Sequence, residues 1–310
     1  MSHANTYEII PTEPRSEVLG RRPSVSSTEN NAIEKAQRER RHALILPREH
    51  GAWGLLLVPM VTGAGVAFRE SAHFVPALLL LVATLALFWL RTPVESLLGT
   101  SAMRAQTADE RRAVASVIAV LVAVAALALG ALLWAGQNPY LWLIGAAAGT
   151  AFVAQALLKK LGRQTRMLSE IVGTIGLTAS GPAAYYLITG KFGAMAWMVW
   201  IANLIFAGDQ IHYVQLRIHT ARVEGFWAKL QRGWAFAGGQ LAMTAVLTVA
   251  CLSGLIPAIA SIAFSPLLFR GWYYFIQKPG PLAVRKLGWN ELTHALAFCV
   301  LFIAAFAMAK

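Results

Sequence analysis

Apolar and polar residues alternate in long blocks along this chain, and the blocks predict a polytopic membrane protein. Several of the apolar blocks approach the roughly 20 residues that a helix needs to cross a bilayer. The nine apolar runs are Ala52–Phe68, Phe74–Leu90, Ala113–Ala135, Tyr140–Leu158, Leu168–Thr189, Ala194–Leu216, Trp234–Leu252, Gly254–Phe269 and Asn290–Ala309. The pattern therefore predicts an all-α bundle of about nine transmembrane helices, joined by short loops on one side and long loops on the other.

The basic residues indicate how this bundle is oriented. Of the 27 Lys and Arg residues, 24 lie in the N-terminal tail or in the segments after runs two, four, six and eight. The last of these segments is predicted as a loop from Arg270 to Trp289. The opposite side receives only Arg69, Lys191 and Lys310. Because positively charged loops stay in the cytoplasm, we expect a multi-pass protein of the cell membrane with its N-terminus inside and its C-terminus outside.

Composition excludes an ordinary soluble domain and argues against nucleic acid as a partner. The 310 residues are 57% hydrophobic and 14% charged, with a net charge of +12. Since the positive charge is distributed loop by loop beside apolar runs, it fits anionic lipid headgroups or an anionic substrate better than a nucleic acid. Membrane lipids are the expected partners, and the sequence names no protein partner.

The chain divides into a tail, residues 1–45, and a transmembrane domain, residues 46–310. Residues 1–41 are rich in Ser, Glu, Arg and Pro and poor in large apolar residues, so a disordered cytoplasmic tail is expected. A short charged helix over Asn30–Arg41 is the alternative for its last part. Within run five, the sequence Ala179-Ser180-Gly181-Pro182 predicts a break or a kink.

Acidic residues and histidines gather near the inner ends of the runs, where ionisable groups are costly unless they are paired or line water. Asp209 and His212 are three residues apart, as are Glu291 and His294, so each pair shares one face of a helix. The candidate catalytic residues are Glu95, Asp209 and Glu291. The candidate ligands of a divalent metal such as Mg²⁺ are His50, Asp209, His212, Glu291 and His294. The candidate phosphate-binding residues are Arg91, Arg217 and Arg222.

Structural roles are the alternatives for these residues. Glu291 follows Asn290 and can be a first-turn acid behind a helix cap, and the histidines can lie at the headgroups.

Two resemblances extend this interpretation. The run from Pro47 to Gly54, with His50-Gly51-Ala52-Trp53 at its centre, resembles the opening of the YwiC-like family of bacterial membrane proteins. The segment from Gly288 to His294 is similar to the Gly-x-x-Glu-x-x-His close of that family. This resemblance implies a bacterial inner membrane protein and names no reaction.

The predicted topology also resembles that of the UbiA-type prenyltransferases. The resemblance implies a UbiA-like bundle in which the loops after helices two and six would carry Asp-rich motifs that hold Mg²⁺ against an isoprenyl diphosphate. The chain departs from that pattern, because Glu95 replaces an Asn-Asp-x-x-x-Asp motif and Asp209 stands alone.

Three functions follow as hypotheses. The first is a prenyltransferase-like enzyme that acts on an isoprenoid or lipid substrate with a modified, Asp-poor site. The second is a proton-coupled small-molecule transporter, and the third is a non-catalytic membrane accessory protein. The sequence does not decide among them, and convergence of the inner acids and histidines would support the first.

Overall fold

The computed structural model describes residues 27–46, 50–70, 73–99, 101, 103–136, 139–162, 165–278, 280 and 282–308. Within these residues all regular secondary structure is helical. The helices are α1 Ser27–Ile45, α2 His50–Ala67, α3 Val75–Leu98, α4 Ala108–Ala135, α5 Pro139–Lys160, α6 Arg166–Thr178, α7 Ser180–Thr189, α8 Ala194–Thr220, α9 Phe226–Arg232, α10 Trp234–Leu252, α11 Ala258–Ser261, the 3₁₀ helix η2 Ile262–Phe264, α12 Ser265–Ile276 and α13 Val284–Met308. The predicted all-α bundle is confirmed.

The chain divides into two compact units, residues 1–43 and residues 44–310. Most of the polar helix α1 belongs to the first unit, and it is longer than the short helix considered over Asn30–Arg41. Residues 1–26 lie outside the described part of the chain, so the disordered tail stays a prediction for them.

Seven described helical segments are long and apolar enough to cross a membrane, and the protein is a multi-pass integral membrane protein. They are Val75–Leu98, Ala108–Ala135, Pro139–Lys160, Met167–Thr189, Ala194–Thr220, Trp234–Leu252 and Val284–Met308. The other two predicted crossings correspond to α2, whose apolar part Trp53–Ala67 is shorter, and to the interrupted segment α11–η2–α12. A total of nine crossings stays a prediction.

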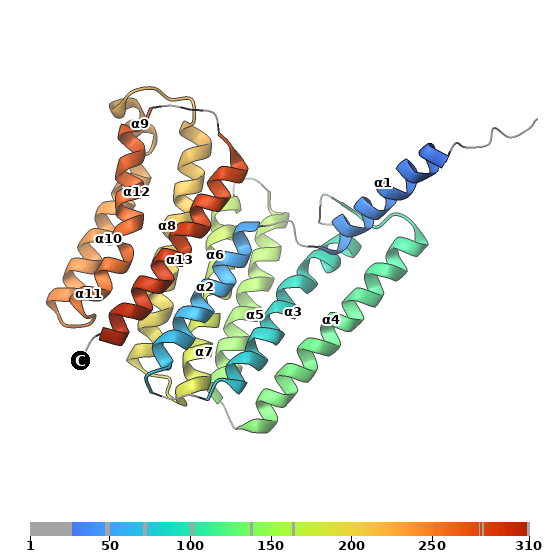
Figure 1. The fold of residues 1–310 in the computed structure, drawn as a ribbon, viewed down its shortest axis with the longest axis horizontal. Helices are drawn as coiled ribbons and strands as arrows, with labels where there is room; N and C mark the ends of the chain where they lie inside the picture. Colours follow the sequence, from blue (N-terminus) through green and yellow to red (C-terminus); the bar gives the residue numbers. More distant parts are fainter. Residues whose placement is uncertain are drawn as a thin grey trace, which may run out of the picture. The chain divides into compact units, whose positions relative to one another are not determined.

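The helices of residues 44–310 run antiparallel, so their ends gather at two opposite ends of the bundle (Figure 1). We call the end at which α3, α5, α8 and α12 finish and α10 and α13 begin the basic end. The predicted basic segments after runs two, four, six and eight all begin in the C-terminal part of helices that finish there.

The core of the bundle forms around α7, α8 and α13. Every residue of α7 from Ser180 to Ile188 is buried. The predicted break is confirmed, because α6 ends at Thr178 and α7 starts at Ser180, just before Pro182. On the other side of α8, Phe206 stacks on Phe298 of α13 with ring centroids 4.5 Å apart. These contacts fix α8 and α13 against each other, and both helices carry candidate site residues.

The predicted loop from Arg270 to Trp289 is wrong. Helix α12 continues to Ile276 and α13 starts at Val284, so the connection is much shorter than expected. A charge normally marks the membrane boundary, so the sequence predicts that the apolar run ends at Phe269, just before Arg270. Here Arg270 is buried and paired, so the helix continues past it with the aromatic residues that follow.

Candidate functional site

A buried arginine joins three helices near the basic end. The Arg270 guanidinium of α12 donates through Nη2 to Asp209 Oδ2 of α8 at 2.6 Å, and through Nη1 to Glu291 Oε2 of α13. The side chains of Arg270, Asp209 and Glu291 are only 6–7% exposed. From α10, Gln240 Nε2 donates to the other oxygen, Asp209 Oδ1. We call Asp209, Gln240, Arg270 and Glu291 the Arg270 cluster.

The charges of this cluster do not balance. Two carboxylates share one guanidinium, so the formal charges of the three groups sum to −1. Buried charges need both a partner and hydrogen bonds, because desolvation costs several kcal/mol per ion. The Tyr213 ring lies 4.1 Å from the Arg270 guanidinium carbon and adds a cation–π contact.

Several polar atoms of the cluster remain without a hydrogen-bond partner among the described residues. They are Arg270 Nε, Gln240 Oε1 and Glu291 Oε1. A buried polar atom that is left unpaired costs about 1–3 kcal/mol. The cluster therefore keeps one hydrogen-bond donor, Arg270 Nε, and two acceptors, Gln240 Oε1 and Glu291 Oε1, for which the described residues provide no partner.

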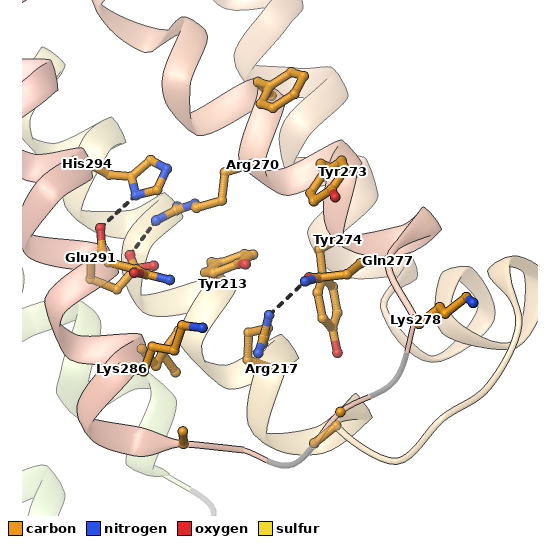
Figure 2. A pocket seen from close by; sticks show the side chains of 16 residues that line it. Tyr213, Arg217, Arg270, Tyr273, Tyr274, Gln277, Lys278, Lys286, Glu291 and His294 are labelled. Atoms are coloured by element: carbon orange, nitrogen blue, oxygen red, sulfur yellow. Dashed lines mark hydrogen bonds and ion pairs between the residues drawn. The ribbon is translucent and has the colours of Figure 1, made fainter.

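A pocket of about 380 Å³ opens beside the cluster, between α8, α12 and α13 (Figure 2). The described residues that line it include four cations, Arg217, Arg270, Lys278 and Lys286, and one carboxylate, Glu291. The pocket has the size of a small-molecule site and an excess of positive charge. It can therefore attract a ligand with an anionic group.

Aromatic residues form the rest of the pocket wall. Tyr213, Tyr273, Tyr274 and Phe269 line it, and Phe269 stacks on Tyr273 with ring centroids 5.8 Å apart. Phe269 is 72% exposed and Tyr273 is 50% exposed. These exposed rings form an apolar side to a pocket that is otherwise basic.

Helix α12 forms one wall of the pocket, and Lys229 of helix α9 holds the C-terminal end of α12 in place. Lys229 is buried, and its Nζ donates to the carbonyl oxygens of Gln277 at 2.5 Å and of Tyr274 at 3.4 Å, at the end of α12. A cation at a helix C-terminus satisfies carbonyls that have no partner within the helix. Burial, and then the nearby charge of Arg217, lower the pKa of Lys229 below its ordinary value. The loop after α8 therefore has a structural role that its sequence did not indicate.

The structure brings some of the predicted residues together and separates others. Asp209 and Glu291 meet at Arg270, and Arg217 and His294 line the pocket. His294 Nδ1 lies 2.7 Å from the carbonyl oxygen of Asn290 in its own helix. Arg217 Nη1 lies 3.5 Å from Gln277 Oε1, and its guanidinium carbon lies 4.8 Å from the centre of the Tyr274 ring.

The remaining predicted residues lie elsewhere. Arg91 and Glu95 pair with each other on α3 at 3.0 Å, and Lys159 of α5 lies 3.5 Å from the same carboxylate oxygen. Neither residue lines the pocket, and neither does Arg222.

The structure brings few of the predicted metal ligands together. The His212 ring packs edge-on against Phe236 at 5.5 Å. The side chain of His50 lies outside the described part of the structure. In that described part, no group of three or more His, Cys, Asp or Glu side chains is placed to hold a metal. Because the position of the His50 side chain is not described, the structure does not test the predicted metal site as a whole, and the site stays a prediction.

Arg270 and Gln240 are the residues that the sequence did not reveal. The charge pattern predicts Arg270 in a loop, and Gln240 is a single polar residue in an apolar run. One signal was available, because the residues after Arg270 continue as a mainly apolar, aromatic stretch, Gly271–Ile276. That continuation predicts that the arginine lies within the helix rather than after it.

Comparison with known proteins bears on the first half of the chain. Residues 46–185 match the sequence profile of the YwiC-like protein family. Over these residues the chain is similar to YwiC-like proteins. The matched segment runs from just before α2 into α7, so Asp209, Arg270 and Glu291 lie beyond it. No curated protein matches the chain. The YwiC-like match therefore supports a membrane protein and does not indicate a reaction.

Proposed function

We propose that this integral membrane protein binds an anionic isoprenoid or lipid in the pocket between α8, α12 and α13 and acts on it there as an intramembrane enzyme. The observation that carries the proposal is the pairing of four cations with exposed aromatic rings in one pocket. An amphiphile offers the matching chemistry, since its headgroup is charged and its tail is apolar. The orientation predicted from the basic loops would place the headgroup at the cytoplasmic face.

Each side chain has a role in this proposal. Arg217 and Lys286 would neutralise a phosphate in the headgroup of the ligand, because guanidinium and ammonium groups donate charge-assisted hydrogen bonds to phosphate oxygens. Asp209 and Glu291 position Arg270, whose charge lies beside the bound headgroup. In a UbiA-like mechanism these carboxylates would ligate Mg²⁺. Arg270 occupies the position between them, so metal binding would first require them to release the arginine.

The test is to measure what the full-length protein carries and converts. We expect purified protein to retain an anionic amphiphile that mass spectrometry detects after extraction. The double variant Arg217→Ala/Lys286→Ala should retain at least fivefold less, because removal of two phosphate contacts costs more than about 1 kcal/mol. The matched control is Lys160→Ala/Arg232→Ala, which removes the same charge at exposed positions that do not line the pocket.

A second measurement tests the enzymatic part. Protein in liposomes would be given a radiolabelled isoprenyl phosphate, with and without Mg²⁺, and the lipids would be followed over time. We expect consumption of the label that depends on Arg217 and Lys286. Binding without conversion would contradict the enzymatic role, and wild-type protein without any bound amphiphile would contradict the whole proposal.

A proton-coupled transporter is the second candidate, and one observation favours it. The Arg270 cluster buries two carboxylates for one guanidinium, and the segment α11–η2–α12 beside it is interrupted, as membrane segments at transport sites often are. Movement of an anionic substrate across vesicles that follows a pH gradient, without chemical conversion, would favour this role over the enzyme.

A further inference from the structure

We infer that the pocket selects a phospholipid whose headgroup carries a free hydroxyl beside its phosphate, and that Glu291 and Arg270 recognise this hydroxyl. The inference rests on the proposed function, because it names the chemical class of the ligand that the same pocket would take. A phosphatidylglycerol-type headgroup is the simplest member of this class.

The first step of the argument is the unpaired oxygen of Glu291. Its Oε2 binds Arg270, whereas Oε1 is buried and has no hydrogen-bond partner among the described residues. Glu291 lines the pocket, and its side chain is only 7% exposed. An ionised carboxylate oxygen can only accept hydrogen bonds, so this position needs a donor from the ligand.

The second step is the unpaired donor of Arg270. Its Nε is buried without a partner in the described residues, and Arg270 lines the same pocket. Figure 2 shows the Arg270 guanidinium beside Glu291 and Tyr213. A hydroxyl can donate one hydrogen bond and accept two, so one hydroxyl can serve both Glu291 Oε1 and Arg270 Nε. An ammonium group would serve only the carboxylate.

The third step places the rest of the ligand. Arg217, Lys278 and Lys286 also line the pocket and provide the charge for a phosphate (Figure 2). Phe269 and Tyr273 expose their stacked rings on α12 and can contact an acyl chain. A phosphatidylglycerol carries the hydroxyl, the phosphate and the acyl tail that these three sets of side chains can contact.

The experiment compares two lipids of equal charge. Full-length protein in detergent would be titrated with phosphatidylglycerol and with phosphatidylmethanol, which has the same phosphodiester and no hydroxyl on its headgroup. We expect phosphatidylglycerol to bind roughly tenfold more tightly, since a hydrogen bond to a charged group is lost with the methyl ester. Phosphatidylcholine, which has no net charge, should bind more weakly than either.

Variants assign the preference to Glu291. In Glu291→Gln the preference should fall to within about twofold, whereas the exposed control Glu224→Gln should keep it. If Glu291→Gln does not fold, the comparison of the two lipids on wild-type protein still decides the matter.

The outcomes separate this inference from the proposed function. Equal binding of the two anionic lipids would overturn the inference and leave the proposed function standing, because a water molecule would then satisfy Glu291. If neither lipid binds better than phosphatidylcholine, the inference fails, and the proposed function fails with it when the purified protein also retains no anionic amphiphile. Displacement of phosphatidylglycerol by micromolar glycerol 3-phosphate would show that the ligand is a soluble phosphate, which would also overturn the inference.

Discussion

Arg270 shows how one residue can hold several membrane helices together. Its side chain leaves α12 and binds carboxylates from α8 and α13, while Gln240 of α10 completes the contacts of Asp209. A charge within a membrane segment is tolerated when its partners are preformed. The cluster therefore contributes both to stability and to the shape of the adjacent pocket.

Replacement of Arg270 should destabilise the protein strongly. Arg270→Ala leaves two buried carboxylates without a counter-charge, which costs about 3–5 kcal/mol in comparable buried pairs. We expect a clearly lower unfolding temperature in detergent, measured by intrinsic fluorescence. Arg232→Ala, at an exposed position, is the control and should unfold like the wild type.

A rescue variant makes the electrostatic explanation testable. Asp209→Asn and Glu291→Gln should recover much of the stability of an Arg270→Leu variant, because they remove the uncompensated charges. An Arg270→Ala protein as stable as the wild type would contradict the role of the cluster. A triple variant that stays as unstable as Arg270→Leu would show that packing, rather than charge, explains the loss.

At the scale of single residues, the sequence predicted only part of the site. Asp209 and Glu291 were identified because acidic residues are scarce in apolar runs and therefore conspicuous. Arg270 was missed because it stands where the run seemed to end, and a pairing partner 61 residues away leaves no local signal. Glu95 was a candidate for the same reason as Asp209, yet its partners are Arg91 and Lys159.

At the scale of helices, close backbone contact fixes the centre of the bundle. A Cβ atom added to Gly63 of α2 would lie 2.1 Å from the carbonyl oxygen of Gly181 in α7. Ser180 Oγ also donates to the carbonyl oxygen of Leu56 at 2.9 Å. In lipid the hydrophobic effect does not favour association of helices, because the surrounding tails are as apolar as the side chains. Close contacts between small residues and interhelical hydrogen bonds therefore hold α7 in place.

Gly63→Ala should therefore destabilise the bundle. The added methyl group collides with backbone, which cannot rotate away, and overpacking of this kind costs about 1–3 kcal/mol. Thermal unfolding in detergent measures the effect. Gly238→Ala in α10 is the matched control, because its added Cβ would meet nothing within 4 Å. Equal stability of the two variants would mean that α2 and α7 are not as close as the structure has them.

Helix boundaries followed the sequence only where breakers mark them. The break before Pro182 was predicted from the residues themselves, since proline lacks an amide donor and disfavours the preceding helical turn. The end of α12 was misplaced by seven residues, from Phe269 to Ile276, because pairing of Arg270 in the interior removed the expected cost of a charge.

At the scale of the whole molecule, the distribution of basic residues predicts an orientation. The Lys and Arg residues gather on one side of the predicted crossings, and the positive-inside rule predicts that this side faces the cytoplasm.

Cysteine labelling tests this orientation. In a variant without Cys251 and Cys299, a cysteine at Ser253 should react with a membrane-impermeant maleimide in intact cells. A cysteine at Glu224 should react only after the membrane is permeabilised. The reverse pattern would contradict the predicted orientation, and labelling of both sites in intact cells would indicate a mixed population.

The sequence by itself determined that this is a multi-pass helical membrane protein, because the length and apolarity of a span and the breaking effect of Pro182 are local properties of the chain. Only the tertiary structure decided which polar residues meet. Asp209, Gln240, Arg270 and Glu291 come from four helices, and their convergence depends on how those helices pack. The sequence predicts Arg270 as a loop cation at the membrane surface. In the structure its ion pairs allow it to be buried, and it forms part of the pocket wall.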